Sequence, residues 1–492
     1  MTYSHACEQR GLRALWGNHP FGHFVECGAF GVMRDLGYRG RALNVMKLVN
    51  GVAAAAAMAA FFVLMTTIVR AGLLRSIGWT ATLGATYGMW HFAGTADIYG
   101  LATLFLIVAW GLIAWSFEHP SAGRSLVSGA AMGLATLTHQ FDGVILAAAG
   151  IGLLPLSSGC PARQRRIGLA IFAMTGFLTV AVGYAALGIL ATGSSSPDAV
   201  IGWLVGYGGD RRFGRFFDLN GARQAVRGIA GTVWYGSGSW PAGSLLFCTA
   251  ALGSVLLLGT VRIRHLPGRA QTLALSSILA FVVGGLLIVW WMPNHTRIWM
   301  LTLPPLAIWG SIALDALGRT AVVNSVTRCR WLFDAVPLLI GVFLIISTGR
   351  VMLLEGQRDE RFEQSLSAWV EHSAPDDLLF ENDRLSAYLR FWAERPGTIE
   401  MFRKLQRAHA TGDPFATLRA LIDEKLRQGH AVWLTAELSP YWSDERLAEV
   451  GVTRQQLLDF FDQYPREGPV FSYQEIKTGE TRHVYRLVSA VK

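Results

Sequence analysis

The sequence predicts an all-α polytopic membrane protein with about ten transmembrane helices and a soluble α/β domain at its C-terminus. Of its 492 residues, 52% are hydrophobic and only 16% are charged, and the apolar residues form long uncharged runs that are typical of membrane-spanning helices. The acidic residues are unevenly divided, because 11 of the 34 lie in residues 1–354 and the other 23 lie in residues 355–492. This division indicates a membrane body followed by a soluble domain.

We therefore expect three regions: an external N-terminal loop (1–45), a transmembrane body (46–350) and an extracytoplasmic soluble domain (351–492). The N-terminal loop shows no signal peptide, and its run from Phe24 to Leu36 suits an interfacial helix. Within the body, ten apolar segments are candidates for membrane spans. They are 48–69, 77–95, 98–117, 125–138, 141–157, 167–191, 242–261, 271–291, 298–316 and 331–349.

The arginines of the connecting loops predict the orientation in the membrane. With the N-terminal loop outside, the cytoplasmic loops hold twelve arginines and the short external turns hold only Arg297. The twelve are Arg70, Arg75, Arg124, Arg163, Arg165, Arg166, Arg262, Arg264, Arg269, Arg319, Arg328 and Arg330. This orientation places the soluble domain on the extracytoplasmic side of a bacterial plasma (inner) membrane.

The N-terminal loop departs from this rule, because it carries five arginines on the outer side: Arg10, Arg13, Arg34, Arg39 and Arg41. The simplest explanation is a first transmembrane helix that precedes Met1 and is missing from this chain. An N-out start assisted by the first span is the alternative.

The segment 125–157 must cross the membrane twice, yet it has only 33 residues. Two full spans need about 40 residues, since one needs about 20. We therefore expect the turn Thr138–Asp142 to lie below the outer surface, at the floor of a depression on the same membrane side as Asp97.

Asp97 is the first candidate site residue. The stretch Trp90–Gly100 places it between two long apolar segments, in a turn too short to leave the membrane surface. A carboxylate in that position is costly unless it has a partner or a task. The structural alternative is that Asp97 caps the following helix, and capping does not exclude a role in chemistry.

Basic and histidine side chains are expected on the same face. Arg297 begins a span on the outer side, where the positive-inside rule disfavours arginine, so a functional role competes with simple snorkelling. His19, His139 and His295 should lie on this face too. For each histidine, a buried or interfacial side chain with a purely structural role is the alternative.

The large external loop, 192–241, contains a glycine-rich, basic and aromatic stretch from Gly206 to Phe217. Arg211 and Arg212 in this stretch suit lipid headgroups or a polyprenyl phosphate, and a plain amphipathic loop is the alternative. The net charge of +9 suits anionic partners such as membrane lipids. Nucleic acid is not expected, because no soluble surface interleaves basic with aromatic residues.

The C-terminal region, 355–492, alternates predicted helices and strands, which is typical of a small α/β domain. The helices are 358–372, 384–394, 414–428 and 453–463, and the strands lie near 377–381, 397–401, 430–436, 469–477 and 482–489. It has no glycine-rich nucleotide loop and no nucleophile motif, so we expect it to support the membrane body or to select the acceptor.

The five cysteines are scattered without the spacing of a metal site. Cys7 and Cys27 can pair if both face an oxidising compartment.

Four short motifs, in order along residues 1–350, carry a resemblance to a known family. They are Asn18-His19-Pro20, the turn Ala96–Tyr99, the segment Gly133–His139, and Leu303–Ala307 after an outer basic residue. In order and spacing the chain resembles the GT-C superfamily of membrane glycosyltransferases, close to bacterial relatives of the protein O-mannosyltransferases. The resemblance implies transfer of a sugar from a polyprenyl-phosphate carrier to an acceptor on the outer face, with inversion.

The resemblance also implies roles for site residues. In that family an aspartate just after the first helix is the general base, and a second acidic residue lies where Asp97 does. Residues 1–34 hold only two acids, Glu8 and Glu26, and no aspartate. The family base is thus absent or was in a lost segment, and Glu8 is the candidate substitute by position. The chemistry of the reaction points to further roles, because the phosphate leaving group needs cations or hydrogen-bond donors. Arg297, His19, His139 and His295 would meet the phosphate, with Arg211 and Arg212 in the external loop, and Asp97 would bind or orient the acceptor or help hold a metal.

A metal ion is optional in this scheme. Mg²⁺ or Mn²⁺ would suit carboxylates and phosphates, but no ligand cluster in the sequence requires one. The acceptor, whether glycan, lipid or protein, is not indicated.

Two other classes of function compete with the enzyme. A transporter or flippase of a lipid-linked or polar substrate would also place ionisable residues near helix ends, but no repeated halves are visible and the polar residues gather at one face rather than at the midplane. A catalytically degenerate scaffold that presents the soluble domain is the third possibility.

Overall fold

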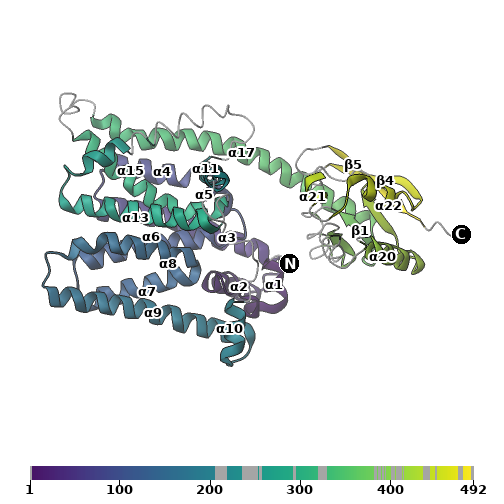
Figure 1. Cartoon of the computed structure of the whole chain (residues 1–492), viewed down its shortest axis with the longest axis horizontal. Helices are drawn as coiled ribbons and strands as arrows, with labels where there is room; N and C mark the ends of the chain where they lie inside the picture. Colours follow the sequence, from purple (N-terminus) through teal and green to yellow (C-terminus); the bar gives the residue numbers. More distant parts are fainter. Residues whose placement is uncertain are drawn as a thin grey trace. The chain divides into compact units, whose positions relative to one another are not determined.

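The computed structural model describes residues 3–205, 219–234, 257–291, 295–319, 330–381, 395–400, 415–435, 444–448, 451–474 and 480–488, with the single positions 253, 385, 389, 393, 405 and 413. The chain divides into two compact units. The first consists of residues 6–351, and the second consists of residues 352–492 together with residues 1–5. The first unit is a bundle of helices, and the second contains a five-stranded sheet (Figure 1).

The long helices of the first unit lie side by side (Figure 1). They are α3 (Ala42–Leu64, extended by the π-turn η2, Met65–Val69), α6 (Tyr99–Glu118), α7 (Ala122–Thr138), α8 (Gln140–Leu153, extended by η3, Leu154–Ser157), α9 (Ala162–Thr192), α13 (Gly268–Trp291), α15 (Leu303–Gly318) and the first part of α17 (Arg330–His372). Among the described residues, seven helical segments are long and apolar enough to cross a membrane. The prediction of a multi-pass membrane protein is thereby confirmed.

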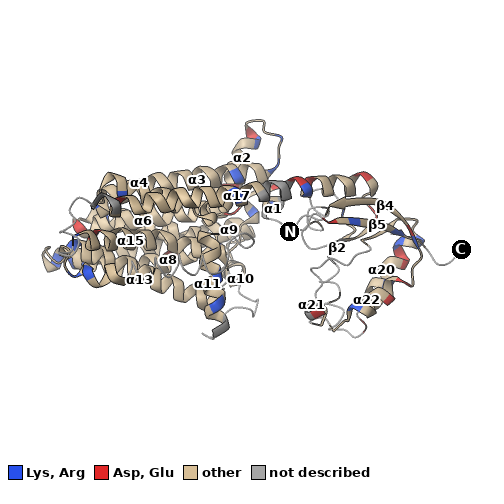
Figure 2. Cartoon of the chain, turned by 90° about the horizontal axis from the view of Figure 1, so that it is seen from above, with Lys and Arg blue, Asp and Glu red and all other residues tan. Residues whose placement is uncertain are grey.

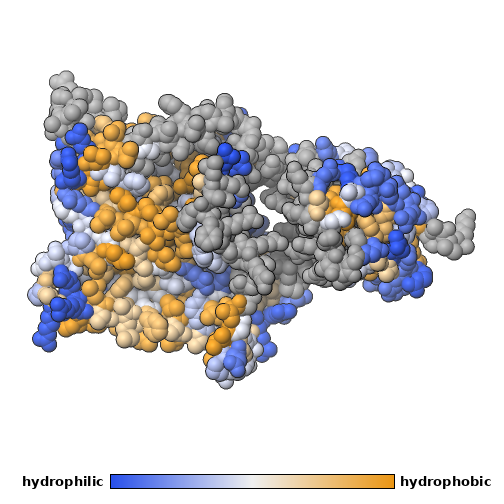
Figure 3. Space-filling view, viewed as in Figure 1, coloured by the Kyte–Doolittle hydropathy of each residue, from blue (hydrophilic) through white to orange (hydrophobic). Residues whose placement is uncertain are grey.

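Charge is concentrated at the ends of this bundle. Hydrophobic side chains cover its middle (Figure 3), and lysine and arginine are rare there but frequent at the ends (Figure 2). We call the end at which α3, α6 and α8 begin the histidine end, and the end at which α7, α9 and α13 begin the arginine end.

Small residues let two helices of the bundle approach closely. A Cβ on Gly129 of α7 would collide with the carbonyl oxygen of Phe172 in α9, and a Cβ on Gly133 would lie 2.5 Å from the Cβ of Thr179. Gly129 and Gly133 are four residues apart and lie on one face of α7. This is the small-xxx-small pattern that packs helices within membranes, where burial of apolar surface gives little driving force.

The predicted span 77–95 is not a single helix. It consists of α4 (Leu73–Gly84) and α5 (Tyr87–Ala93), because Thr86 is in extended geometry with ψ 145°. The hydroxyl of Thr86 donates to the carbonyl of Leu83 at 2.8 Å, and the carbonyl of Ala85 accepts from the hydroxyl of Thr348 in α17 at 2.9 Å. Backbone groups released at the break therefore have partners, as a membrane-embedded break requires.

Other predicted elements differ in extent. The predicted span 331–349 and the tail helix 358–372 are one continuous helix, α17. The external loop 192–241 contains two helices, α10 (Pro197–Val205) and α11 (Leu219–Val233). Most of the predicted span 242–261 lies outside the described residues.

The N-terminal region forms three short elements: α1 (Tyr3–Arg10), the 3-10 turn η1 (Gly11–Ala14) and α2 (Pro20–Asp35). A disulfide joins Cys7 of α1 to Cys27 of α2, with 5.6 Å between the two Cα atoms. The pairing that the sequence allowed is therefore present, and it ties α2 to the start of the chain.

The second unit is the predicted α/β domain. Its strands are β1 (Leu378–Glu381), β2 (Thr398–Glu400), β3 (Val432–Thr435), β4 (Arg466–Gln474) and β5 (Thr481–Leu487), and its helices are the end of α17, α20 (Ala416–Arg427), α21 (Asp444–Ala448) and α22 (Arg454–Phe461). The strand order is β2-β1-β3-β5-β4. β1 is parallel to β2 and to β3, whereas β5 is antiparallel to β3 and β4.

Gly129→Ala should destabilise the bundle, because the added methyl meets a backbone carbonyl of α9 that cannot move independently of its helix. Overpacking of this kind costs about 1–3 kcal/mol. Gly123→Ala is the matched control in the same helix, since a Cβ there has no atom within 4 Å. Thermal unfolding of the purified protein in detergent would measure both; equal midpoints for the two variants would contradict the close α7–α9 contact.

Candidate functional site

Asp97 and Arg297 form an ion pair at the histidine end. Asp97 lies in the turn between α5 and α6, and Arg297 lies in α14 (Thr296–Trp299), the short helix that leads through the 3-10 turn η5 (Met300–Thr302) into α15. Arg297 Nη1 is 2.7 Å from Asp97 Oδ2. The Asp97 side chain is 20% exposed and that of Arg297 is 50% exposed, so the cation is the more accessible partner.

Asp97 is not the N-cap of α6. That position is held by Ile98, which makes no side-chain cap, while Asp97 Oδ1 accepts the N–H of Ile98 at 3.0 Å. Burial raises the pKa of Asp97 above its ordinary value, and the positive charge of Arg297 opposes that shift. Because Oδ1 of Asp97 accepts the N–H of Ile98, Oδ2 is the oxygen that faces Arg297.

Asn50 of α3 fixes the turn that carries Asp97. Its side-chain N–H₂ donates to the carbonyls of Phe92 and of Thr95, the second at 3.1 Å, and its Oδ1 accepts the N–H of Gly100 at 2.8 Å. Asn50 is fully buried, and a Cβ on Gly100 would collide with it. One amide therefore bridges the end of α5 and the start of α6.

Histidines line the same end of the bundle. His19 precedes Pro20 at the start of α2, and its ring stacks on that of His139 with 4.4 Å between centroids. His139 separates α7 from α8, and its Nδ1 accepts the N–H of Phe141 at 3.3 Å. Burial lowers the pKa of His19 to about 3, and burial with the nearby charge of Arg297 lowers that of His295 to about 4. His19 and His295 are therefore neutral imidazoles at neutral pH.

Gly22 brings α2 against the rest of the site. A Cβ at this position would lie 3.0 Å from Cγ2 of Ile98 and 3.5 Å from the carbonyl oxygen of Thr138. These two residues neighbour Asp97 and His139. The absence of a side chain at Gly22 thus allows α2, the Asp97 turn and the His139 turn to meet.

Glu26 of α2 is a buried carboxyl that the sequence reasoning did not select. It is fully buried, neither of its oxygens has a hydrogen-bond partner among the described residues, and Oε2 is 3.7 Å from Nδ1 of His23. Burial, with the negative charge of Asp97, raises the pKa of Glu26 well above its usual range. The signal in the sequence was the position of Glu26 in the apolar run that follows Phe24. A carboxyl group in an apolar run is energetically costly unless it has a role.

Several other buried polar atoms of this region lack a hydrogen-bond partner among the described residues. They are Asn18 Oδ1, His19 Nδ1, His295 Nδ1 and both carboxylate oxygens of Asp142. Buried polar groups in native proteins are almost always hydrogen-bonded, to protein or to water. These atoms lie near the Asp97 turn and the His139 turn, so the polar groups of this region are available to hydrogen-bond a polar molecule.

The remaining predicted residues are placed differently. Glu8 accepts the N–H of Ala42 at 2.8 Å, so it binds the first residue of α3. Arg211 and Arg212 lie outside the described residues. Within the part of the chain that the structure describes, no three His, Cys, Asp or Glu side chains are grouped to hold a metal ion. Of the predicted residues, the structure brings Asp97 to Arg297 and His19 to His139.

Comparison with solved structures supports the predicted fold. The whole chain is similar to ArnT from Cupriavidus metallidurans bound to undecaprenyl phosphate, with a TM-score of 0.51 and 12% sequence identity over 99% of this chain and 93% of that one. The apo state of the same protein gives a TM-score of 0.48 at 12% identity, over 98% and 92% of the two chains. No family model and no curated protein matches this sequence. The GT-C resemblance is thus confirmed for the fold; the narrower likeness to protein O-mannosyltransferases stays a prediction.

Asn50→Leu should loosen the Asp97 turn. The variant keeps the branching of the side chain but leaves the carbonyl of Thr95 and the N–H of Gly100 without the partner that Asn50 supplies. This costs about 1–3 kcal/mol for each buried group, while the carbonyl of Phe92 still accepts the hydroxyl of Thr95 at 3.2 Å. Hydrogen exchange measured by mass spectrometry should show faster exchange in 93–100. Asn44→Leu, at an exposed position of the same helix, is the control, and unchanged exchange in Asn50→Leu would refute this role for Asn50.

Glu26→Gln should raise the thermal unfolding midpoint at pH 7 but not at pH 4. Because the folded pKa of Glu26 is raised, the folded protein keeps its proton at pH values where the unfolded chain has released it. This group's contribution to stability is full below the unfolded pKa of about 4.5 and is lost as pH rises toward the folded pKa. Glutamine has no such loss.

Fluorimetric melts in detergent at the two pH values, compared at each pH with the parent protein, would measure this effect. Asp198→Asn, at an exposed position of α10, is the control for removal of a carboxyl. A shift for Glu26→Gln that is the same at pH 4 and pH 7 would contradict the buried, protonated state.

Proposed function

We propose that this protein is a membrane glycosyltransferase that moves a sugar from a polyprenyl-phosphate carrier to an acceptor on the extracytoplasmic face. The observation that carries the proposal is the Asp97–Arg297 pair at the end of an apolar bundle. The reaction needs a carboxylate to take a proton and a cation to receive a phosphate, and this pair supplies both. The likeness in fold to a protein solved with undecaprenyl phosphate supports the choice of carrier.

Arg297 would bind the phosphate of the donor. Its guanidinium lies 5.6 Å from the centre of the Phe92 ring, and its half-exposed side chain leaves N–H groups available to a second anion. In this structure the guanidinium binds Asp97. The phosphate of the donor would compete with Asp97 for the guanidinium of Arg297. Binding of the donor would therefore release the Asp97 carboxylate.

The released carboxylate would act as the base. An acceptor hydroxyl attacks the anomeric carbon, the bond from that carbon to the phosphate oxygen breaks, and the electron pair stays on the polyprenyl phosphate. Asp97 takes the proton of the hydroxyl as the new glycosidic bond forms. Burial raises the pKa of Asp97, and a base whose pKa is closer to the working pH transfers protons more effectively.

The histidines would orient the phosphate without adding charge. His19 and His295 are neutral at neutral pH, and a neutral imidazole donates one N–H hydrogen bond. α2 begins at Pro20, directly after His19, with no side-chain cap and no acid in its first turn, and the first N–H groups of a helix have no partner within the helix. Helix N-termini of this kind bind phosphate groups well.

Glu26 rather than Glu8 would be the second acidic group of the site. Glu8 binds the start of α3, whereas Glu26 lies close enough to Asp97 for the charge of Asp97 to raise the pKa of Glu26. Because burial raises the pKa of Glu26, its protonated form is favoured, and in that form it would donate its O–H to the Asp97 carboxylate or to the acceptor. It would position the base rather than replace it.

The disulfide supports an extracytoplasmic site. Cys7 and Cys27 join α1 and α2 beside His19 and Glu26, and disulfides persist in oxidising compartments. The arginines at the opposite end of the bundle agree with this orientation under the positive-inside rule.

A transporter of a lipid-linked substrate is the second candidate, because it too would use a site of unpartnered polar groups. The position of the polar groups at one end of the bundle rather than at its midplane favours transfer chemistry. Substrate counterflow in vesicles without sugar transfer would favour the transporter.

Asp97→Asn and Arg297→Gln should both abolish most transfer from radiolabelled undecaprenyl-phosphate sugars, tested as a panel of hexosyl and pentosyl donors with membranes as the source of acceptor. Loss of the base should lower the rate by about 100- to 10,000-fold, and loss of the phosphate cation by about 100- to 1,000-fold. Asp97→Asn should still bind the donor, because Arg297 remains.

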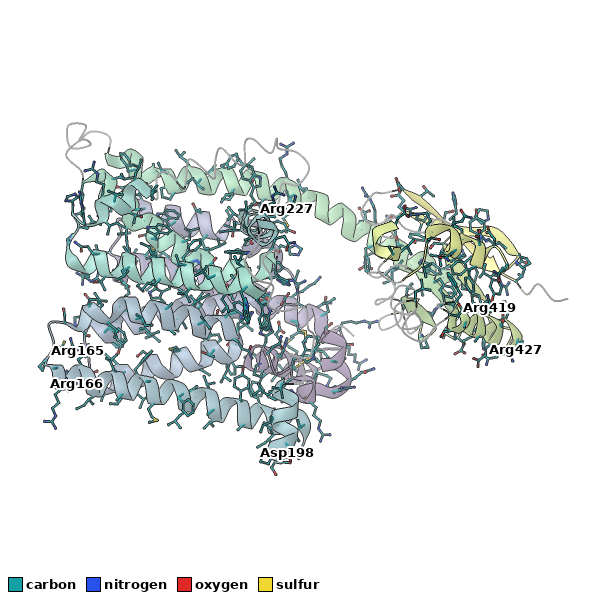
Figure 4. All side chains as sticks on the ribbon, viewed as in Figure 1. Arg165, Arg166, Asp198, Arg227, Arg419 and Arg427 are labelled. Carbon is teal, nitrogen blue, oxygen red and sulfur yellow. A yellow bond between two sulfur atoms is a disulfide. The ribbon has the colours of Figure 1, made fainter. Side chains whose placement is uncertain are left out.

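Asp198→Asn is the matched control, since Asp198 is an exposed carboxyl on α10, labelled in Figure 4. Undiminished transfer in both site variants would refute the assignment of Asp97 and Arg297. If the unsubstituted protein transfers no sugar from any donor, the result would favour a scaffold or a transporter function.

A further inference from the structure

A cavity of about 370 Å³ lies at the arginine end, between the starts of α7 and α9. Its lining consists of Ser121, Ala122, Pro161, Arg163, Gln164, Ile167 and Gly168. The opening is bridged on one side by Gln164, whose side-chain N–H₂ donates to the carbonyl of Pro120 at 2.7 Å. This cavity is separate from the Asp97 site, which lies at the opposite ends of the same helices.

Arginines without acidic partners line the cavity or are close to its lining residues in the sequence. Arg163 lines it, and Arg165 and Arg166 follow in the first turn of α9 (Figure 4). Among the described residues none of the three forms an ion pair. Arg124, in the first turn of α7, donates to the carbonyl of His119 at 2.9 Å and lies 4.4 Å from the centre of the Trp115 ring, again without a carboxylate.

Three other arginines at this end, Arg70, Arg75 and Arg269, are paired with carboxylates. Glu118 binds Arg269 at 2.7 Å and Arg70 at 3.3 Å, and Arg75 binds Asp315 at 3.1 Å as well as Asp334. Arg163, Arg165 and Arg166 therefore keep their positive charge beside the cavity, whereas these paired arginines do not. A site of this kind attracts an anion from outside the chain.

The surroundings of the cavity are those of the membrane surface. α6 ends at Glu118 and α9 begins at Ala162, and both are long and apolar enough to cross a bilayer. Ile167 lines the cavity and is 48% exposed, and Trp115 and Leu126 nearby are 39% and 52% exposed. Apolar side chains beside basic ones suit a molecule that carries both acyl chains and a negative headgroup.

We propose that this cavity binds the phosphate of an anionic phospholipid. Arg163 contacts the phosphate, Arg124 and Arg166 supply further positive charge, and the exposed apolar side chains along α7 and α9 contact the acyl chains. Basic pockets between membrane helices bind anionic headgroups in this way. The lipid would cover the point at which α7 and α9, which pack through glycines, enter the membrane surface.

The test uses the full chain in detergent and titrates it with dioleoylphosphatidylglycerol, with native mass spectrometry to count bound lipids. Dioleoylphosphatidylcholine, with the same acyl chains and no net charge, and inorganic phosphate in large excess are the two comparison probes. The variants are Arg163→Gln, which removes the contacting charge, and Ala122→Trp, which fills the cavity and keeps every charge. Arg262→Gln is the control, since Arg262 is an exposed arginine that precedes α13 and does not line the cavity.

We expect one saturable phosphatidylglycerol site that phosphatidylcholine does not occupy. Arg163→Gln should weaken it about five-fold, as loss of one arginine near a headgroup predicts, Ala122→Trp should abolish it, and Arg262→Gln should leave it unchanged. Equal loss in Arg163→Gln and Arg262→Gln, unchanged binding in Ala122→Trp, or equal binding of phosphatidylcholine would overturn the proposal. Displacement of the lipid by inorganic phosphate would assign the cavity to a small anion and would also overturn it.

Discussion

Backbone that leaves helical geometry inside an apolar bundle needs hydrogen-bond partners from its neighbours, and this constraint explains the arrangement of the histidine end. The chain must turn sharply between α5 and α6 to expose a carboxylate there. Asn50 supplies the partners on both sides of that turn, and Gly100 leaves room for it. The turn is thereby fixed by α3, and Asp97 can meet an arginine 200 residues further along the chain.

Some of this arrangement could be predicted from the sequence. The long apolar runs predicted the helical bundle, and the acids concentrated after residue 355 predicted a separate C-terminal domain. Both features follow from composition over many residues. Asp97 and Arg297 were recognisable because each is a charge at the edge of an apolar segment. The break at Thr86 was not, because it depends on a hydrogen bond from Thr348, and hydropathy carries no information about such a distant partner.

Glu26 and Asn50 were missed for a related reason. Both are single polar residues within stretches that are otherwise apolar, and their burial depends on which face of the helix packs inward. For α2 that face is determined by Gly22, which contacts the neighbours of Asp97 and His139, and no property of α2 alone reveals these partners. Glu8 was chosen by its position in the chain, and position could not show that its carboxylate binds the N-terminus of α3.

The two ends of the bundle deal with polar groups in opposite ways. At the arginine end, carboxylates join helices that are distant in sequence, as Glu118 of α6 does with Arg269 of α13, and such links hold the helix ends in register. At the histidine end, the buried carboxyl of Glu26 and the imidazole of His19 have atoms without a hydrogen-bond partner among the described residues. Since α6 starts beside Asp97 and ends at Glu118, its far end is anchored while its first turn borders groups that can accept a ligand. The ion pair of Arg297 with Asp97 lies at the histidine end, beside these polar groups, whereas the ion pairs of the arginine end link helices.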